Sequence, residues 1–259
     1  MLEELFSMQD KVCVITGGSR GLGFYMAKGF FAAGAKRIYI TARKVEECNA
    51  AAKELSQYGE CIALTGDLSS MDEIQRLADT LGEREDSIDV LVNNAGCGWL
   101  EPLDSFSEMG WDKVMDLNVK TPFFLTKALL PLLKHGASAE ATAAIINIGS
   151  IAGISAATDT LSYAPSKAAI HQMTRNLAVI LADDHIRVNA IAPGRFFSKM
   201  TEYASENKAL YEAEIAYIPL HRWGEENDIS GVAILLASPA GAFITGQIIP
   251  VDGGTTLVR

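Results

Sequence analysis

Short apolar runs alternate with longer helical stretches along almost the whole chain, and this alternation limits the fold more than any other feature. The runs are apolar at consecutive positions, so each strand is expected to be covered on both faces. Such strands, each separated from the next by a helix, form a parallel sheet with helices on both sides. We therefore predict a single α/β domain over residues 1–259, with a doubly wound Rossmann-type fold and a mostly parallel sheet of seven strands.

The pattern also gives approximate boundaries. Strands are predicted at 12–16, 37–42, 61–66, 89–94, 144–149, 186–192 and 247–251, and helices at 21–33, 45–58, 71–81, 111–134, 163–182 and 227–237. Ser70 is placed to act as an N-cap. Pro122 should bend or break the helix over 111–134. Pro165 suits only a first turn, so Tyr163 is expected close to the start of its helix.

Charge and hydropathy exclude several classes of protein. The formal net charge of −10 and the pI of about 4.9 repel phosphate backbones and anionic lipid, so neither nucleic acid nor a membrane surface is an expected partner. The N-terminus is acidic and does not resemble a signal peptide, and the longest apolar stretch, 143–157, is interrupted by polar residues and glycines. We expect a soluble protein of the cytoplasm.

The cysteines indicate neither a metal site nor a disulfide framework. Two disulfides are conceivable, but four reduced and mostly buried thiols fit a core of this size better. The four are not in Cys-x-x-Cys spacing and have no paired histidines nearby: Cys13, Cys48, Cys61 and Cys97. No metal is expected.

The segment 195–226 departs from the regular alternation. It contains aromatic residues, Met and charges without a predicted strand, and it follows the carboxyl end of a strand. Insertions at that place in such folds cover the ligand, so we expect a substrate lid there.

The first strand leads directly into a glycine-rich loop, Thr16-Gly-Gly-Ser-Arg-Gly-Leu-Gly23. Glycines at 17, 21 and 23 allow a tight turn and let a pyrophosphate approach the amides at a helix N-terminus. The spacing differs from G-x-G-x-x-G, and by itself the loop could be an ordinary strand-to-helix turn.

A tyrosine and a lysine four residues apart suggest acid–base chemistry. Tyr163 and Lys167 share a helix face about one turn apart. A free tyrosine titrates near pH 10, and a nearby ammonium is expected to lower that pKa. Tyr163 can then give a proton to a carbonyl oxygen or take one from an alcohol. Ser150, at the end of a strand, can donate a hydrogen bond to the same oxygen.

These motifs together resemble the short-chain dehydrogenase/reductase superfamily. The glycine loop, Asn93-Asn-Ala-Gly96, Asn118, Ser150, Tyr163-x-x-x-Lys167 and Pro193-Gly194 occur in the family's order, and the resemblance extends from about residue 9 to Gly254. One departure is that Ser198 stands where the family usually has threonine.

The resemblance implies roles for particular residues. Asn118, Ser150, Tyr163 and Lys167 would be the catalytic group, with Asn118 fixing a water that relays protons to Lys167. The cofactor would be held by Gly17, Ser19, Arg20, Gly21, Leu22, Gly23, Arg43, Asp67, Leu68, Asn94, Ala95, Gly96, Tyr163, Lys167, Pro193, Gly194 and Ser198. Relatives of this length usually form two-fold-symmetric tetramers, so a homotetramer or homodimer is implied. We assign His171 and the three tryptophans to packing.

The end of the second strand predicts which nicotinamide cofactor is used. An acidic residue there binds the ribose hydroxyls of NAD, but this strand ends Ala42-Arg43-Lys44 and the first carboxylate is Glu46. Arg43, with Arg20 from the glycine loop, is suited to a 2′-phosphate. We predict NADP(H).

The reaction class is thus an NADP(H)-dependent oxidoreductase acting on a small-molecule carbonyl or the matching secondary alcohol. The segments 146–155 and 191–196 resemble 3-oxoacyl reductases of the rhamnolipid-biosynthesis type, which nominates a 3-oxoacyl thioester. Two alternatives remain: an alcohol or polyol dehydrogenase that works oxidatively, and a non-catalytic regulatory protein that keeps the cofactor-binding fold.

Overall fold

The computed structural model describes residues 1–156, 160–198, 201 and 207–258. Its centre is a seven-stranded sheet in the order β3-β2-β1-β4-β5-β6-β7, and every neighbouring pair is parallel. The strands are β1 (Val12–Thr16), β2 (Arg37–Ala42), β3 (Glu60–Thr65), β4 (Val90–Asn93), β5 (Ala143–Ile148), β6 (Ile186–Pro193) and β7 (Ile248–Val251). The predicted doubly wound α/β fold is confirmed, and the sheet is entirely parallel.

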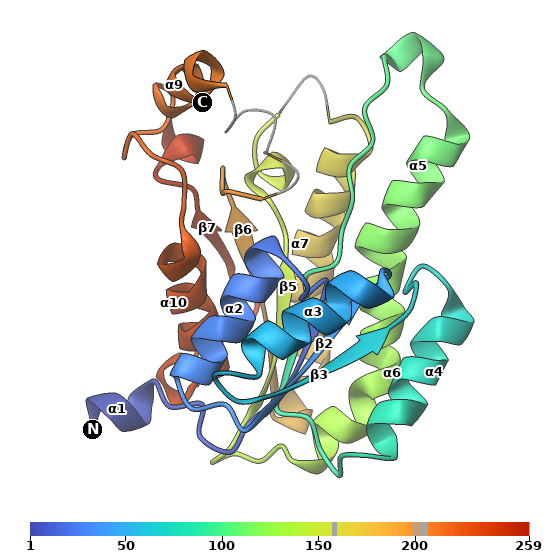
Figure 1. The fold of residues 1–259 in the computed structure, drawn as a ribbon, viewed down its shortest axis with the longest axis vertical. Coiled ribbons are helices and arrows are strands. Elements are labelled where there is room, and N and C mark those ends of the chain that lie inside the picture. Colours follow the sequence, from blue (N-terminus) through green and yellow to red (C-terminus); the bar gives the residue numbers. More distant parts are fainter. Residues whose placement is uncertain (157–159, 199–200, 202–206, 259) are drawn as a thin grey trace.

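Helices cover both faces of this sheet (Figure 1). The longer ones are α2 (Gly21–Ala32), α3 (Val45–Leu55), α4 (Met71–Gly82), α5 (Glu108–Met115), α6 (Thr121–His135), α7 (Tyr163–Ile180), α9 (Lys208–Ile215) and α10 (Glu226–Ala237). The described residues also form the short helix α1 (Leu2–Leu5) and the 3₁₀ turns η1 (Leu103–Ser105), η3 (Ile151–Gly153), η4 (Ala182–Asp184), η5 (Pro239–Gly241) and η6 (Thr255–Leu257).

Two apolar clusters hold the layers together, one on each face of the sheet. The first joins α2, α3 and α10 to the sheet through residues such as Phe30, Leu55 and Leu236. The second joins α4, α6 and α7 through residues such as Leu77 and Leu129. Strands β1, β4, β5 and β6 are buried at every position, as their consecutive apolar residues require.

The helix predicted over 111–134 is two α-helices. A π-helical stretch, η2 (Asp116–Lys120), separates α5 from α6, and Pro122 lies in the first turn of α6. The break that Pro122 predicted is therefore present, just before the proline. Single π turns inside α-helices are often found at functional sites, and this one contains Asn118.

Two predictions about helix starts can be checked directly. Tyr163 is the first residue of α7, so Pro165 falls in the first turn as expected. Ser70 occupies the N-cap position of α4, but its side chain makes no capping hydrogen bond. In the described part of the chain, no helix combines the length and apolar character needed to span a bilayer.

Candidate active site

The strand order reverses between β1 and β4, because β2 and β3 lie on one side of β1 and the later strands lie on the other. In open parallel sheets, ligands bind at the carboxyl ends of the strands beside such a reversal. The glycine loop follows β1, and Asn94, Ala95 and Gly96 follow β4. The two predicted cofactor motifs therefore meet at this edge.

The glycine loop has room for a phosphate group close to its backbone. Gly17 and Gly21 have positive φ angles of 65° and 55°, which glycine adopts at little cost. A Cβ on Gly23 would lie 2.5 Å from the Gly17 carbonyl oxygen, so a larger residue there would not fit. Gly21 begins α2, whose N-terminal amides favour an anion. This cradle fits the pyrophosphate of a dinucleotide.

Thr16 and Asn94 bind the two loops together. The Thr16 hydroxyl accepts hydrogen bonds of 2.9 Å from the backbone amides of both Asn94 and Ala95. The Asn94 side chain donates to the carbonyls of Thr16 and Gly17 at 2.8 and 3.0 Å. Asn94 therefore shapes the cradle. Thr16, which was not among the predicted site residues, does the same.

Basic side chains surround the expected position of the adenosine ribose. Arg20 and Arg43 are exposed, and Ser19 is half-buried between the glycines. Arg20 Nη1 lies 2.9 Å from Glu47 Oε2, and Lys44 pairs with the same carboxylate. A 2′-phosphate bound by Arg20 would thus compete with Glu47 on α3, a carboxylate that the sequence did not single out.

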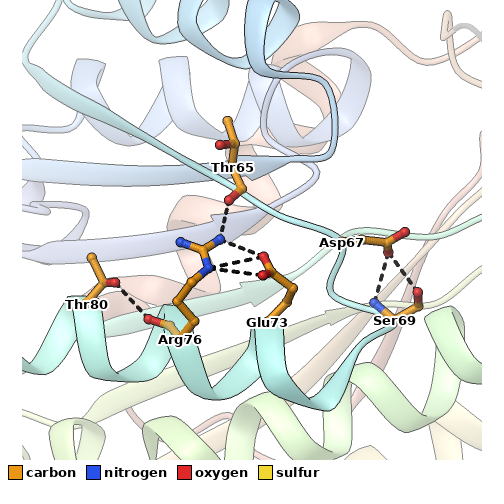
Figure 2. Close-up of polar contacts among 6 residues, drawn as sticks. All are labelled: Thr65, Asp67, Ser69, Glu73, Arg76 and Thr80. Atoms are coloured by element: carbon orange, nitrogen blue, oxygen red, sulfur yellow. Dashed lines mark hydrogen bonds and ion pairs between the residues drawn. The ribbon is translucent and has the colours of Figure 1, made fainter.

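Asp67 follows β3, and its carboxylate accepts hydrogen bonds from Ser69 (Figure 2). Burial opposes its charge, but hydrogen bonds from the hydroxyl and amide of Ser69 and the attraction of Arg43 outweigh that effect and lower the pKa of Asp67. In the same figure Arg76 on α4 binds the Thr65 carbonyl and Glu73, which fixes the end of β3. The carboxylate of Asp67 is thus held ionised at the predicted adenine end.

Leu22 and Leu68 belong to different apolar clusters, Leu22 to the first and Leu68 to the second. Leu68 is buried, and its carbonyl accepts a hydrogen bond of 2.6 Å from the Thr121 hydroxyl. Leu22 packs against the first core cluster. Both side chains are used in packing, so any contact with a cofactor would add to that role.

The segment after β6 approaches the glycine loop from the other side. β6 ends at Pro193, and the Gly194 amide donates to the Val251 carbonyl at 2.9 Å. A Cβ on Gly21 would lie 3.6 Å from Ser198 Cβ, so these two segments are neighbours. The Ser198 amide donates to the Thr201 hydroxyl at 3.0 Å. The structure therefore brings Ser198 to the glycine loop.

Tyr163 and Lys167 lie on the same face of α7. Lys167 Nζ is 5.5 Å from the centroid of the Tyr163 ring and donates a 2.8 Å hydrogen bond to the Ile148 carbonyl. Only 4% of Lys167 is exposed, and burial lowers its pKa to about 8. Gly96 lies beside the ammonium, since a Cβ there would be 3.5 Å from Nζ.

The prediction that Lys167 lowers the pKa of Tyr163 is wrong for this structure. Burial raises the pKa of Tyr163, although a hydrogen bond with Ser150 and the charge of Arg195 act in the opposite direction. The ammonium faces the tyrosine ring and binds a backbone carbonyl, and desolvation is the larger effect.

Ser150 follows β5 and precedes the turn η3. Its hydroxyl oxygen accepts a hydrogen bond of 3.1 Å from the Ala152 amide, which leaves the hydroxyl proton to be donated elsewhere. The Ser150 side chain lies close enough to Tyr163 to lower its pKa, so the two side chains are neighbours. The three residues predicted for acid–base chemistry are thus brought to one place.

The Asn118 side chain makes hydrogen bonds within the protein. Its Oδ1 accepts from the Cys97 amide, and its Nδ2 donates to the Cys97 carbonyl, both at 2.9 Å. The second amide hydrogen goes to Ser166 Oγ at 3.0 Å. The buried side chain therefore holds the loop after Gly96 against α7, and any bond to a relay water is additional to this.

Two further features of the site, besides Thr16 and Glu47, were missed from the sequence. Arg195 directly follows Pro193-Gly194, and its charge reaches Tyr163; this adjacency to a motif was the available signal. Asn93 belongs to a buried chain of hydrogen bonds that runs through Asn147 to Thr174 and fastens β4 and β5 to α7. No sequence pattern identified that chain.

The fold and these motifs define a class of protein. Residues 17–256 match the family described as enoyl-(acyl carrier protein) reductase. The chain belongs to the short-chain dehydrogenase/reductase family, and it is an oxidoreductase, as predicted from the sequence.

Particular relatives are similar over nearly their whole length. The rhamnolipids biosynthesis 3-oxoacyl-[acyl-carrier-protein] reductase of Pseudomonas aeruginosa is 49% identical over 250 residues, covering 96% of this chain and 97% of that protein. The 2-dehydro-3-deoxy-D-gluconate 5-dehydrogenase of Escherichia coli K12 is 35% identical, with 98% of each chain covered.

A solved structure described as the Pseudomonas aeruginosa RhlG/NADP active-site complex has a TM-score of 0.95 and 48% identity. It covers 98% of this chain and 99% of that one. The cofactor predicted from Arg43 and Arg20 is the one that this relative binds.

Proposed function

We propose that the protein reduces the ketone of a 3-oxoacyl thioester with NADPH, through Ser150, Tyr163 and Lys167. The observation that carries this proposal is the meeting of three side chains: Ser150 lies close enough to Tyr163 to lower its pKa, and Lys167 Nζ lies 5.5 Å from the centroid of the same ring. Two hydroxyls directed at one point can both donate to a single carbonyl oxygen.

The cofactor site is formed by the cradle and the basic residues around it. The glycine loop holds the pyrophosphate, Arg20 and Arg43 hold the 2′-phosphate, and Lys167 holds the nicotinamide ribose. When bound, NADPH supplies the hydride. Asn94, Gly96, Pro193 and Ser198 line the nicotinamide end of the cleft, and Asp67 with Leu68 lines the adenine end.

The proton comes from Tyr163. Its raised pKa keeps the hydroxyl protonated near neutral pH, which is the form needed to protonate the oxygen of a ketone during reduction. Ser150 donates to the same oxygen and stabilises the negative charge that develops there. Lys167, with a pKa of about 8, stays largely protonated at pH 7, and a water held at Asn118 would relay protons from solvent to it.

The proposed substrate class rests on the similarity of this chain to its relatives. The relative with 49% identity acts on a 3-oxoacyl group, whereas the sugar-acid dehydrogenase is 35% identical. The segment 195–226 would cover the acyl chain. Its described part includes α9, joined to the site by the Arg195–Glu214 ion pair and by contacts among Phe197, Tyr211 and Trp223. Met200 and Tyr203 of this segment lie outside the described residues.

A panel assay tests the reaction. NADPH oxidation is followed by absorbance with acetoacetyl thioesters, 3-oxoacyl esters of increasing length, diketones and cyclic ketones, and NADP⁺ reduction is followed with secondary alcohols and polyols. The proposal expects the highest kcat/KM for a 3-oxoacyl compound. Higher values for a polyol would support the oxidative alternative. Cofactor binding without turnover of any compound would support the regulatory one.

The same proposal includes a homotetramer in the cytoplasm. Phe123 and Ile180 are 44% and 67% exposed, and Val179 beside Ile180 is 80% exposed, so α6 and α7 present apolar surface. Phe124 and Leu177, on the same two helices, pack against the second core cluster and are not part of this apolar surface. The four cysteines are free, which fits a reducing compartment. A monomeric mass by light scattering at micromolar concentration would refute the oligomer.

A further inference from the structure

His171 continues the line of residues that begins with Tyr163 and Lys167. The three are spaced four residues apart on α7, so they occupy one helix face. Only 4% of His171 is exposed, and its Nε2 atom has no hydrogen-bond partner among the described residues. An unpaired polar atom in a core costs stability, and an aliphatic side chain of similar size would avoid that cost.

The imidazole of His171 fills the space between Gly149 and Gly153, the two glycines that flank Ser150 in the sequence. A Cβ on Gly149 would lie 2.2 Å from His171 Nε2, and a Cβ on Gly153 would lie 2.9 Å from its Cε1. A hydrogen bond connects the ring with the Gly153 backbone. Backbone hydrogen bonds also hold both glycines in place. The Gly149 amide donates to the Ile191 carbonyl, and the Gly153 amide donates to the Ser150 carbonyl.

The ring is neutral in this place. Burial and the charges of Lys167 and Arg175, both on α7, lower the pKa of His171 to about 4. A neutral imidazole carries one N–H, and donation of that proton to the Gly153 carbonyl leaves Nε2 as the bare nitrogen against Gly149. This tautomer accounts for the nitrogen that binds the Gly153 backbone and for the Nε2 atom that has no partner.

We propose that His171 is a positioning residue that sets the place of the Ser150 hydroxyl beside Tyr163, by filling the space between Gly149 and Gly153 and binding the Gly153 backbone. The inference rests on the proposed function, because it assigns Ser150 a role in the reaction. His171 touches neither substrate nor cofactor in this account. Its effect on the rate is exerted through Ser150.

Two substitutions separate the hydrogen bond from the volume. His171→Leu keeps much of the volume and removes the donor. His171→Asn places Nδ2 where the imidazole has Nδ1 and keeps the donor. With ethyl acetoacetate as the probe, His171→Leu should lower kcat about tenfold or more and leave the KM for NADPH within twofold. His171→Asn, which keeps the donor, should have a kcat between that of His171→Leu and that of the unmodified enzyme. A kcat for His171→Leu equal to that of the unmodified enzyme would overturn the proposal.

A double-mutant cycle with Ser150→Ala distinguishes positioning from a general structural effect. Removing one donor to a developing oxyanion typically lowers kcat about 10²- to 10³-fold. If His171 acts through Ser150, adding His171→Leu to Ser150→Ala should lower kcat by less than twofold more. An equal loss in both backgrounds would overturn the positioning role. If Ser150→Ala alone were fully active, the proposed function would fail instead.

If His171→Leu folds poorly, the contact between Gly149 and the His171 ring can be tested with a second pair of substitutions. Gly149→Ala should damage the enzyme because its methyl group would meet the imidazole, and the pair Gly149→Ala with His171→Ala should recover part of the lost kcat. Recovery supports the contact. A double variant no better than Gly149→Ala alone would contradict it.

Discussion

Lys167 Nζ lies 5.5 Å from the centroid of the Tyr163 ring and donates a hydrogen bond to the Ile148 carbonyl. The ammonium is therefore held against the ring by the backbone of β5, and burial leaves Tyr163 with a raised pKa. A tyrosine that keeps its proton can act as a general acid. The protonated form is the one needed to protonate the oxygen of a ketone during reduction.

Cofactor selectivity should depend on the guanidinium groups near the ribose. Arg43→Ala should raise the KM for NADPH and barely alter that for NADH, because only NADPH carries the 2′-phosphate. A lost charge-assisted contact of about 1.5 to 3 kcal/mol corresponds to roughly a tenfold to hundredfold change. Ala42→Asp should reverse the preference. Steady-state kinetics with both cofactors measures this, and equal kcat/KM for the two in the unmodified enzyme would contradict it.

Lys167→Ala should weaken NADPH binding and slow turnover together, because the ammonium is assigned both the ribose and the proton supply. Binding is measured by fluorescence titration and turnover with a saturating ketone. Lys120→Ala, which removes an exposed lysine paired with Asp116, is the matched control and should change neither. NADPH affinity unchanged in Lys167→Ala would exclude the ribose contact.

His171 gives stability a specific dependence on pH. Its pKa is about 4 in the folded protein, against 6.5 for a histidine free in water, so the unfolded chain binds more protons between these values. Stability should therefore fall as pH is lowered from about 6.5 to 4, by up to about 3 kcal/mol from this group. His171→Asn should flatten that part of the curve in urea unfolding. A slope identical to the unmodified protein would show that the histidine is not buried neutral.

The lid proposal predicts a change in α9. Backbone amides of Lys208–Ile215 should exchange hydrogen more slowly when NADP⁺ and a 3-oxoacyl ester are both present, since closure would order this helix. Hydrogen exchange with mass spectrometry compares the free and ternary states, with α4 as an internal reference. Equal exchange in both states would remove any gating role.

The parts of the fold that depend on local pattern were predictable. Apolar runs and glycine boundaries located every strand, and Pro165 located the start of α7. The π turn at Asp116–Lys120 was not predictable, because its cause lies in contacts that join Asn118 to Cys97 and Ser166 across the fold. The pKa of Tyr163 was mispredicted for a similar reason: helix spacing shows that Lys167 is near, but not that burial is the larger effect.

The candidate site shows the same division. Motif order indicated Ser150, Tyr163 and Lys167, and the structure brings these residues together. The carboxylate of Glu47 beside Arg20 and the support of His171 under Ser150 arise from helices that meet other segments only in the folded chain. Residue spacing in the sequence does not predict contacts between segments that are far apart in the chain.

Tyr163→Phe tests the central claim most directly. The substitution removes one hydroxyl and keeps the ring beside Lys167, so NADPH affinity should stay within about twofold of the unmodified enzyme. Single-turnover oxidation of bound NADPH by a saturating 3-oxoacyl ester should slow by about 10² to 10⁴, the usual contribution of a general acid. A Tyr163→Phe enzyme that retained more than a tenth of the original rate would contradict the assignment of Tyr163 as the proton donor.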